Sequence, residues 1–162
     1  MSILVTGGLG YIGSMTVAAL QTRGDEVVVV DNLSTGHPES IPVDVPLVRG
    51  ELADHDLLRS VIREHRVDLV IHFSACTSVP ESVQHPGKYF ENNTLNTLGL
   101  LEIMRQSGIS QIIYSSTATI YGEPEQTPLD ENHPMLPTNP YGQSKRFSEI
   151  ILDAFGRAWG LR

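Results

Sequence analysis

The sequence predicts an α/β fold in which a doubly wound parallel sheet carries helices on both faces. Short runs rich in Val, Ile and Leu alternate with longer stretches of helical periodicity. Strands that are apolar along their whole length suit a sheet buried on both faces, and strand-helix-strand alternation joins parallel strands through right-handed crossovers. A hydrophobic fraction of 40% in 162 residues excludes a disordered chain and supplies one folded core.

Five segments are predicted to be strands because each is short, rich in Val, Ile or Leu, and bounded by Gly, Pro or polar turns. In chain order these segments are Ser2–Thr6, Glu26–Asp31, Val45–Val48, Val67–Phe73 and Gln111–Ser115. Half of the 10 prolines fall within residues 124–140, so this part of the chain is predicted to be a long loop.

Four helices are predicted from apolar spacing and from the residues that bound them. They are Tyr11–Arg23, a helix capped by Asp54, Tyr89–Ser107 and Tyr141–Trp159. The spacing also predicts which residues of three of these helices face inward. They are Ile12, Met15 and Ala19 in the first helix, Leu57, Leu58, Val61 and Ile62 in the helix capped by Asp54, and Phe147, Ile150, Ile151, Ala154 and Phe155 in the last helix.

Charge and residue content exclude several classes of function. With 11 Lys+Arg against 19 Asp+Glu the net charge is −8, which disfavours nucleic-acid and anionic-membrane partners. The single cysteine, Cys76, excludes an intrachain disulfide, and the 6 histidines show no paired metal spacing, so no metal site is expected. No signal peptide or membrane-spanning apolar run is recognisable, so a cytoplasmic location is expected.

The first candidate site is the glycine-rich turn TGGLGYIG at residues 6–13, which follows a predicted strand and opens a predicted helix. Gly7 lets the chain leave the strand, Gly10 lets the backbone approach a diphosphate, and Gly13 lets the helix pack closely on the sheet. The diphosphate would lie at the helix N-terminus. Glycine spacing alone also fits a tight structural turn, which the position between strand and helix disfavours.

The second candidate is Asp31, at the end of the next predicted strand. A carboxylate there can accept both hydroxyls of an adenosine ribose and would repel a 2′-phosphate, which favours NAD over NADP. An isolated Asp at this position more often starts a turn, here Asp31-Asn32-Leu33. The glycine motif nearby favours the cofactor role.

Two further groups carry hydroxyl and amine chemistry. Tyr141 and Lys145 lie one turn apart at the start of a predicted helix, hence on one face. A nearby ammonium and a cationic nicotinamide favour a tyrosine phenolate, which makes Tyr141 a candidate general base; the alternative is a lysine that snorkels beside a half-buried tyrosine. Ser115 and Thr117 follow the last predicted strand and either face the ligand crevice or satisfy turn backbone.

These motifs together resemble the extended short-chain dehydrogenase/reductase family, and within it the nucleotide-sugar 4-epimerases. The resemblance covers essentially all 162 residues. The matching stretches are VTGGLGYIGS at 5–14, VDNLSTG at 30–36, VIHFSA at 70–75, ESV at 81–83, NNTLNT at 92–97, SSTATIYGEP at 115–124 and PTNPYGQSK at 137–145.

The resemblance implies a Rossmann-like sheet of strand order 3-2-1-4-5, NAD as cofactor, and 4-epimerisation of UDP-glucose and UDP-galactose through a 4-keto intermediate. It implies that Tyr141 removes the proton of the sugar 4-hydroxyl, that Lys145 binds the nicotinamide ribose and keeps Tyr141 ionised, and that Thr117 hydrogen-bonds the same oxygen. The residues expected to bind the cofactor are Gly7, Gly10, Tyr11, Ile12, Gly13, Asp31, Asn32, Leu33, Ser34, Thr35, Gly36, Glu51, Leu52, Phe73, Ser74, Ala75, Cys76, Thr77, Asn92, Ser115, Tyr141 and Lys145.

Four positions depart from the family's usual pattern. Glu51 stands in place of an Asp beside the adenine, Thr77 in place of a Lys near the phosphates, Ser74 in place of Ala, and Met15 in place of His. None of the four belongs to the expected catalytic trio. Glu51 keeps the carboxylate on a longer side chain, so only the geometry of the adenine contact is placed in question.

The length is the other departure, because family members continue into a sixth strand and a substrate-binding domain. We therefore expect residues 1–162 to be an incomplete NAD-binding domain, either a fragment or a truncated product, with negligible turnover by itself. The full-length form is expected to be a homodimer through the Tyr89–Ser107 and Tyr141–Trp159 helices, although the same apolar residues could form an ordinary core.

Other functions share these motifs. A UDP-pentose or N-acetylhexosamine 4-epimerase would use the same mechanism. A 4,6-dehydratase would share the cofactor step, but the sequence TAT at 117–119 lacks the Asp-Glu pair that its elimination needs. A non-catalytic NAD-binding module is the third alternative, which the presence of Tyr141, Lys145 and Thr117 disfavours and the short length favours.

Overall fold

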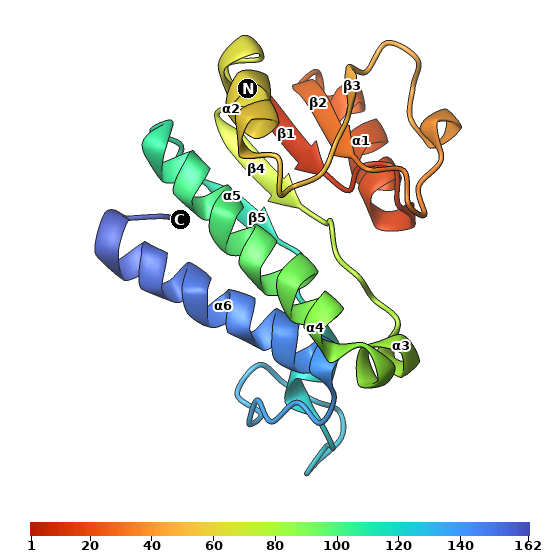
Figure 1. Ribbon diagram of the computed structural model, residues 1–162, viewed down its shortest axis with the longest axis vertical. Helices are drawn as coiled ribbons and strands as arrows, with labels where there is room; N and C mark the ends of the chain where they lie inside the picture. The colour runs from red at the N-terminus through yellow and green to blue at the C-terminus, as the bar shows by residue number, and fades with distance from the viewer.

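The computed structural model describes residues 1–162 and contains one five-stranded parallel sheet (Figure 1). Its strands are β1 (Ser2–Thr6), β2 (Glu26–Asp31), β3 (Leu47–Arg49), β4 (Leu69–His72) and β5 (Ile112–Tyr114). Every pair is parallel and the order across the sheet is β3-β2-β1-β4-β5. The predicted fold class and strand order are therefore confirmed.

Helices cover both faces of this sheet. Figure 1 shows α5 and α6 running side by side on one face, away from α1. The helices are α1 (Tyr11–Arg23), α2 (His55–Glu64), α3 (Val79–Gln84), α4 (Pro86–Tyr89), α5 (Asn96–Gln106) and α6 (Pro140–Trp159). A π-helical stretch, Phe90–Leu95, joins α4 to α5, and short 3-10 turns form at Pro38–Ser40 and Ala118–Tyr121. No helix is long and apolar enough to cross a membrane.

The sheet separates two apolar cores. Alternate strand residues such as Leu4 and Val70 pack against α2, α5 and α6. Their neighbours, such as Val5, pack on the opposite face against Val17 and Leu20 of α1. Burial on both faces holds the central strands rigidly, so the loops that leave their carboxyl ends start from fixed positions.

The ends of the main helices follow from local capping. The Asp54 side chain accepts a hydrogen bond from the Leu57 N–H at 3.0 Å and begins α2 as predicted. Asn139 does the same for α6, accepting from the Gly142 N–H at 2.9 Å. Gly24 ends α1 in a left-handed conformation with φ of 85°. The first turn of α6, which carries Tyr141, is therefore firmly placed.

Some boundaries differ from the predicted ones. The third strand begins at residue 47 rather than 45 because Pro46 has no N–H for the ladder, although its carbonyl accepts from the Val29 N–H at 2.9 Å. The fourth and fifth strands are also shorter than predicted. The predicted helix over 89–107 is helical up to Gln106, and its Phe90–Leu95 part is π-helical. The sequence did not predict α3.

The predicted inward face of α1 is wrong. Gly13 faces the sheet, together with Val17 and Leu20 at helical spacing from it. A Cβ on Gly13 would overlap the Gly7 carbonyl oxygen and lie 2.8 Å from Gly8 Cα, so this side of the helix must touch the preceding turn. The residues predicted to face inward are exposed instead: Ile12, Met15 and Ala19.

The predicted inward face of α6 is correct only in part. Ile151 and Phe155 contribute to the core, whereas Phe147 and Ile150 are 50% and 48% exposed and Ala154 is exposed. The buried side chains of its first turns are polar instead: Ser144, Lys145 and Ser148. Both serines hydrogen-bond to Asn93 of the π-helical stretch, so this end of α6 packs against polar groups rather than against an apolar core.

Candidate active site

The glycine turn between β1 and α1 is compact for steric reasons. Gly7 has a φ of 70°, and a Cβ there would lie 2.6 Å from the Ser74 backbone nitrogen. The turn therefore lies directly against the chain that leaves β4. A Cβ on Gly13 would overlap the Gly7 carbonyl oxygen, so the N-terminus of α1 packs closely against the carboxyl end of β1.

Gly10 differs from the other two glycines. The only atom near its position for a Cβ is the Gly7 carbonyl oxygen, at 3.5 Å, which is an ordinary contact. Gly10 also precedes α1 without a side-chain capping bond, and Tyr11 and Ile12 are 86% and 59% exposed. Open backbone N–H groups at a helix N-terminus can bind a diphosphate.

Asp31 ends β2 and is buried, with 8% exposed. One carboxylate oxygen accepts from the Leu9 N–H at 3.1 Å and the other from the Leu33 N–H at 2.9 Å. The side chain thus forms the predicted turn and also ties it to the glycine turn. Each oxygen keeps a lone pair that can accept a ribose hydroxyl, so the structural and cofactor roles are compatible.

The residues around Asp31 lie at the carboxyl ends of β2 and β3. The Asn32 amide donates to both carboxylate oxygens of Glu51, at 3.3 and 3.1 Å. Gly36 packs under Leu9, where a Cβ would lie 2.5 Å from the Leu9 Cβ. The other predicted adenosine-side residues are Ser34 and Thr35, which are exposed, and Leu52, which packs into the apolar core.

The loop that leaves β4 is held in place by a residue that the sequence did not predict. Asn93, 1% exposed, accepts from the Cys76 N–H at 2.8 Å and donates to the Cys76 carbonyl at 2.9 Å. It also donates to the Ser144 hydroxyl of α6 at 3.0 Å. The predicted neighbour, Asn92, donates to Asn93 at 2.9 Å.

Asn93 therefore connects two predicted parts of the site. It joins the segment Phe73–Thr77, expected along the cofactor, to the helix that carries Tyr141. The π-helical stretch around it places an amide where both can be reached, and π-helical turns often mark functional sites. The sequence does show two adjacent asparagines, Asn92 and Asn93, inside a helical pattern. Only Asn92 was predicted to lie near the cofactor.

Tyr141 and Lys145 lie on the first turns of α6, as predicted. Lys145 is 2% exposed, forms no ion pair, and has its ammonium 4.2 Å from the centre of the Tyr114 ring. Burial lowers the pKa of Lys145 to about 8, with Glu149 acting in the opposite direction. Lys145 is buried rather than snorkelling, and it remains mostly protonated at pH 7.

Thr117 starts the 3-10 turn that follows β5. Its hydroxyl accepts from the Thr119 N–H at 3.2 Å and lies 3.1 Å from the Thr119 hydroxyl. This turn packs on the start of α6, because a Cβ on Gly142 would lie 2.7 Å from the Thr119 carbonyl oxygen. Ser115 continues from β5 through its N–H bond to the His72 carbonyl at 3.1 Å. The Ser116 hydroxyl is buried without a partner.

A buried histidine links the strands behind these residues. His72 is 1% exposed, with Nδ1 2.6 Å from the Thr6 hydroxyl and Nε2 3.0 Å from the Thr97 hydroxyl. Burial, assisted by the positive charge of Lys145, lowers the pKa of His72 to about 3. His72 is therefore a neutral structural link between β1, β4 and α5.

Acid is expected to destabilise the fold through His72. Its unfolded-state pKa of 6.5 exceeds the folded value of about 3, so unfolding takes up a proton below pH 6.5. Between pH 7.5 and pH 5.0 this group alone should lower the free energy of unfolding by about 2 kcal/mol. Urea unfolding at both pH values measures this change in the wild type, in His72→Gln and in the exposed control His37→Gln. An unchanged pH dependence in His72→Gln would contradict this assignment.

Comparisons with known proteins show the family of the chain and its fold. Residues 3–162 match the NAD dependent epimerase/dehydratase family. The chain belongs to this family. The UDP-glucose 4-epimerase of Azospirillum brasilense is 49% identical over 160 residues, which are 99% of this chain and 46% of that relative. The chain spans about half the length of the curated relatives it matches.

Two solved structures of similar proteins have the same fold. The Thermus thermophilus UDP-glucose 4-epimerase in complex with NAD gives a TM-score of 0.96 at 43% identity, covering 100% of this chain and 53% of that one. The UDP-Glc/GlcNAc 4-epimerase of Campylobacter jejuni gives 0.93 at 38% identity, covering 98% and 50%.

The residues present fit NAD, the cofactor of the family. The uncapped N-terminus of α1 and the open space at Gly10 suit a diphosphate. Asp31 suits a ribose with free hydroxyls. No group of three or more His, Cys, Asp or Glu side chains is placed to hold a metal ion.

Proposed function

We propose that residues 1–162 form the NAD-binding part of a longer nucleotide-sugar 4-epimerase that interconverts UDP-glucose and UDP-galactose through a 4-keto sugar. One observation carries the proposal: Tyr141 lies one turn from a buried, unpaired Lys145, at the sheet edge that also carries the open glycine turn. The relatives' greater length supports a second part that completes the sugar pocket.

The proposed cofactor site follows the carboxyl edge of the sheet from β3 to β5. The turn between β1 and α1 would bind the diphosphate, and the residues after β2 and β3 the adenosine. The residues after β4 and β5, with Asn92 and Lys145, would bind the nicotinamide half. NAD held by these residues would supply reversible hydride transfer at sugar C4, with no net oxidation or reduction over a full cycle.

The chain's own side chains would handle the proton. Tyr141 would take the proton from the sugar 4-hydroxyl as general base and return it after the sugar has turned over. The Lys145 ammonium would stabilise negative charge on the Tyr141 oxygen during this transfer, because a nearby positive charge favours an ionised phenol. The Thr117 hydroxyl would hydrogen-bond the same sugar oxygen and fix its direction.

A substrate panel tests this proposal. Full-length protein with bound NAD is incubated with UDP-galactose, UDP-N-acetylgalactosamine and a UDP-pentose, and products are separated by chromatography. We expect UDP-galactose to be epimerised fastest. Faster turnover of the N-acetylated sugar or of the pentose would identify that sugar as the substrate instead. The N-acetylated sugar is included because the Campylobacter jejuni neighbour is named a UDP-Glc/GlcNAc 4-epimerase. Loss of water from the sugar would indicate a dehydratase, and no turnover with NAD bound would indicate a non-catalytic module.

The charge of Asp31 is expected to set cofactor preference. The wild type should bind NAD at least about tenfold more tightly than NADP, because the carboxylate repels a 2′-phosphate. Asp31→Asn should remove most of this preference while keeping the size of the side chain, and Asp44→Asn, at an exposed position, is the control. Fluorescence titration measures both affinities. Equal affinities in the wild type would refute the assignment.

We also propose that the full-length protein is a homodimer. The π-helical stretch and α6 pack against each other, and both carry exposed large apolar side chains, among them Leu95 at 59%, Phe147 at 50% and Ile150 at 48%. Such a patch is typical of an interface. Sedimentation should show a dimer that Phe147→Glu dissociates, and a monomeric wild type would contradict the proposal.

A further inference from the structure

Tyr89 is a buried tyrosine whose ring contacts that of the proposed base. It is the last residue of α4, is 0% exposed, and meets the Tyr141 ring edge-on, with ring centres 6.3 Å apart and planes at 79°. Edge-to-face pairs are favourable and have a defined geometry. The Tyr89 ring is thus a fixed wall beside the Tyr141 ring.

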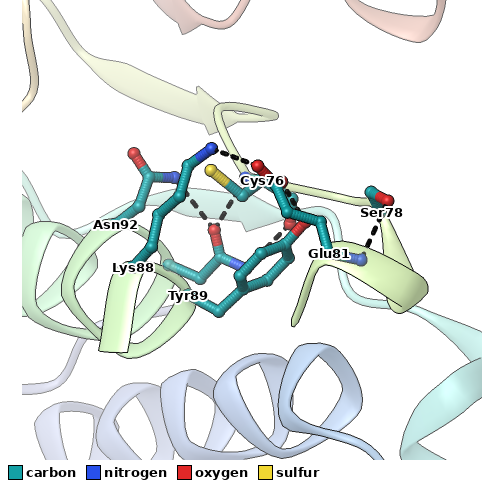
Figure 2. A network of polar contacts seen from close by, with 7 residues as sticks. Cys76, Ser78, Glu81, Lys88, Tyr89 and Asn92 are labelled. Carbon is teal, nitrogen blue, oxygen red and sulfur yellow. Dashed lines mark hydrogen bonds and ion pairs between the residues drawn. The ribbon is translucent and has the colours of Figure 1, made fainter. Parts of the chain in front are cut away.

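The hydroxyl of Tyr89 is bound on the side of α3. It donates to one carboxylate oxygen of Glu81 at 2.7 Å, while the Lys88 ammonium donates to the other at 2.6 Å (Figure 2). Glu81 is itself held by its N–H bond to the Ser78 hydroxyl at 3.3 Å. A tyrosine fixed at both its ring and its hydroxyl has little freedom to turn.

Tyr89 is also prevented from acting as a competing base. Burial and the neighbouring Glu81 carboxylate raise the pKa of Tyr89 to about 12. Tyr89 therefore remains a neutral donor to Glu81 at the pH where Tyr141 would work. The two tyrosines in contact thus differ: the Tyr89 hydroxyl is bound to a carboxylate, whereas Tyr141 lies on the helix that carries Lys145.

We propose that Tyr89, anchored by Glu81, is a positioning residue that fixes the Tyr141 ring for proton transfer. This inference rests on the proposed role of Tyr141. The ring contact limits rotation of the Tyr141 side chain, so its oxygen keeps one position relative to the first turns of α6. Misplacing a reacting group by about 1 Å can lower a rate by about a hundredfold.

The kinetic test uses full-length protein with NAD bound. Tyr89→Leu should lower kcat for UDP-galactose by about 10- to 100-fold, with KM changed less than about threefold. Tyr89→Phe, which keeps the ring but loses the bond to Glu81, and Glu81→Gln, which weakens that bond, should each lower kcat, but by less than Tyr89→Leu does. Phe90→Leu is the matched control, because it removes the adjacent aromatic ring, which packs on Phe147 instead. In a Tyr141→Phe background, Tyr89→Leu should cause no further loss.

A second readout does not need turnover. Protein labelled with 3-fluorotyrosine gives a 19F signal for Tyr141, assigned by its loss in Tyr141→Phe. We expect one narrow line in the wild type and in Phe90→Leu, and a shifted or split line in Tyr89→Leu. An unchanged line in Tyr89→Leu, or an equal loss of kcat in the Tyr141→Phe background, would overturn the proposal. If the wild type converts no UDP-sugar, the epimerase function fails while the 19F result still decides the positioning role.

Discussion

Replacing Tyr141 by phenylalanine should lower kcat of the full-length protein by about 10²- to 10⁴-fold, because the general base is lost. The ring contact with Tyr89 and the burial of Lys145 do not depend on the hydroxyl, so the fold and the bound NAD should be retained. Turnover of UDP-galactose and the absorbance of bound cofactor measure the two effects separately.

The matched control for this substitution is Tyr121→Phe. Tyr121 also follows β5 and packs edge-on against His133 in the long loop, but no role in proton transfer is proposed for it. Removing the Tyr121 hydroxyl should change kcat less than about threefold, because this hydroxyl takes no part in the reaction. Near-normal turnover in Tyr141→Phe would remove Tyr141 from the mechanism.

Substitution of the glycines should separate folding from cofactor binding. Gly13→Ala should destabilise the chain by about 3 kcal/mol or more, because its Cβ meets backbone atoms of Gly7 and Gly8 that cannot move independently. Gly10→Ala should fold normally, because its Cβ makes only an ordinary contact. It should nevertheless weaken NAD binding by about tenfold or more, since the methyl group would occupy the space of the diphosphate.

Gly87→Ala provides the control, because nothing lies within 4 Å of the Cβ position in this helical residue. Urea unfolding measures stability and calorimetry measures NAD affinity for all three variants. Unaltered NAD affinity in Gly10→Ala would contradict the placement of the diphosphate. A fully stable Gly13→Ala would contradict the close packing of α1 on the turn.

The sequence was sufficient for the features that are local. Apolar runs predicted the parallel sheet, and the motifs at strand ends predicted which residues gather at its carboxyl edge. Apolar spacing was insufficient on α1 and α6, because each helix has two partly apolar sides. On α1 the decisive contact is Gly13 against Gly7, and a glycine adds nothing to an apolar pattern. On α6 the site end buries Ser144 and Lys145 instead of Phe147.

The rest of the site depends on contacts between distant segments. Asn93 joins the loop after β4 to α6, and Glu81 anchors a tyrosine that touches Tyr141. His72 has an equally non-local role between β1 and α5. Each of these polar residues lies in a stretch whose local pattern gives no sign of its partner. Only the folded chain brings them together.

The central claim, that epimerisation proceeds by removal and return of the C4 hydride within one site, can be tested with an isotope. Full-length protein with bound NAD is incubated with UDP-galactose deuterated at C4 in ordinary water, and the UDP-glucose formed is examined by mass spectrometry and NMR. The account predicts that the product keeps its deuterium at C4, because the hydride never exchanges with solvent. UDP-glucose that carries solvent hydrogen at C4 would contradict it.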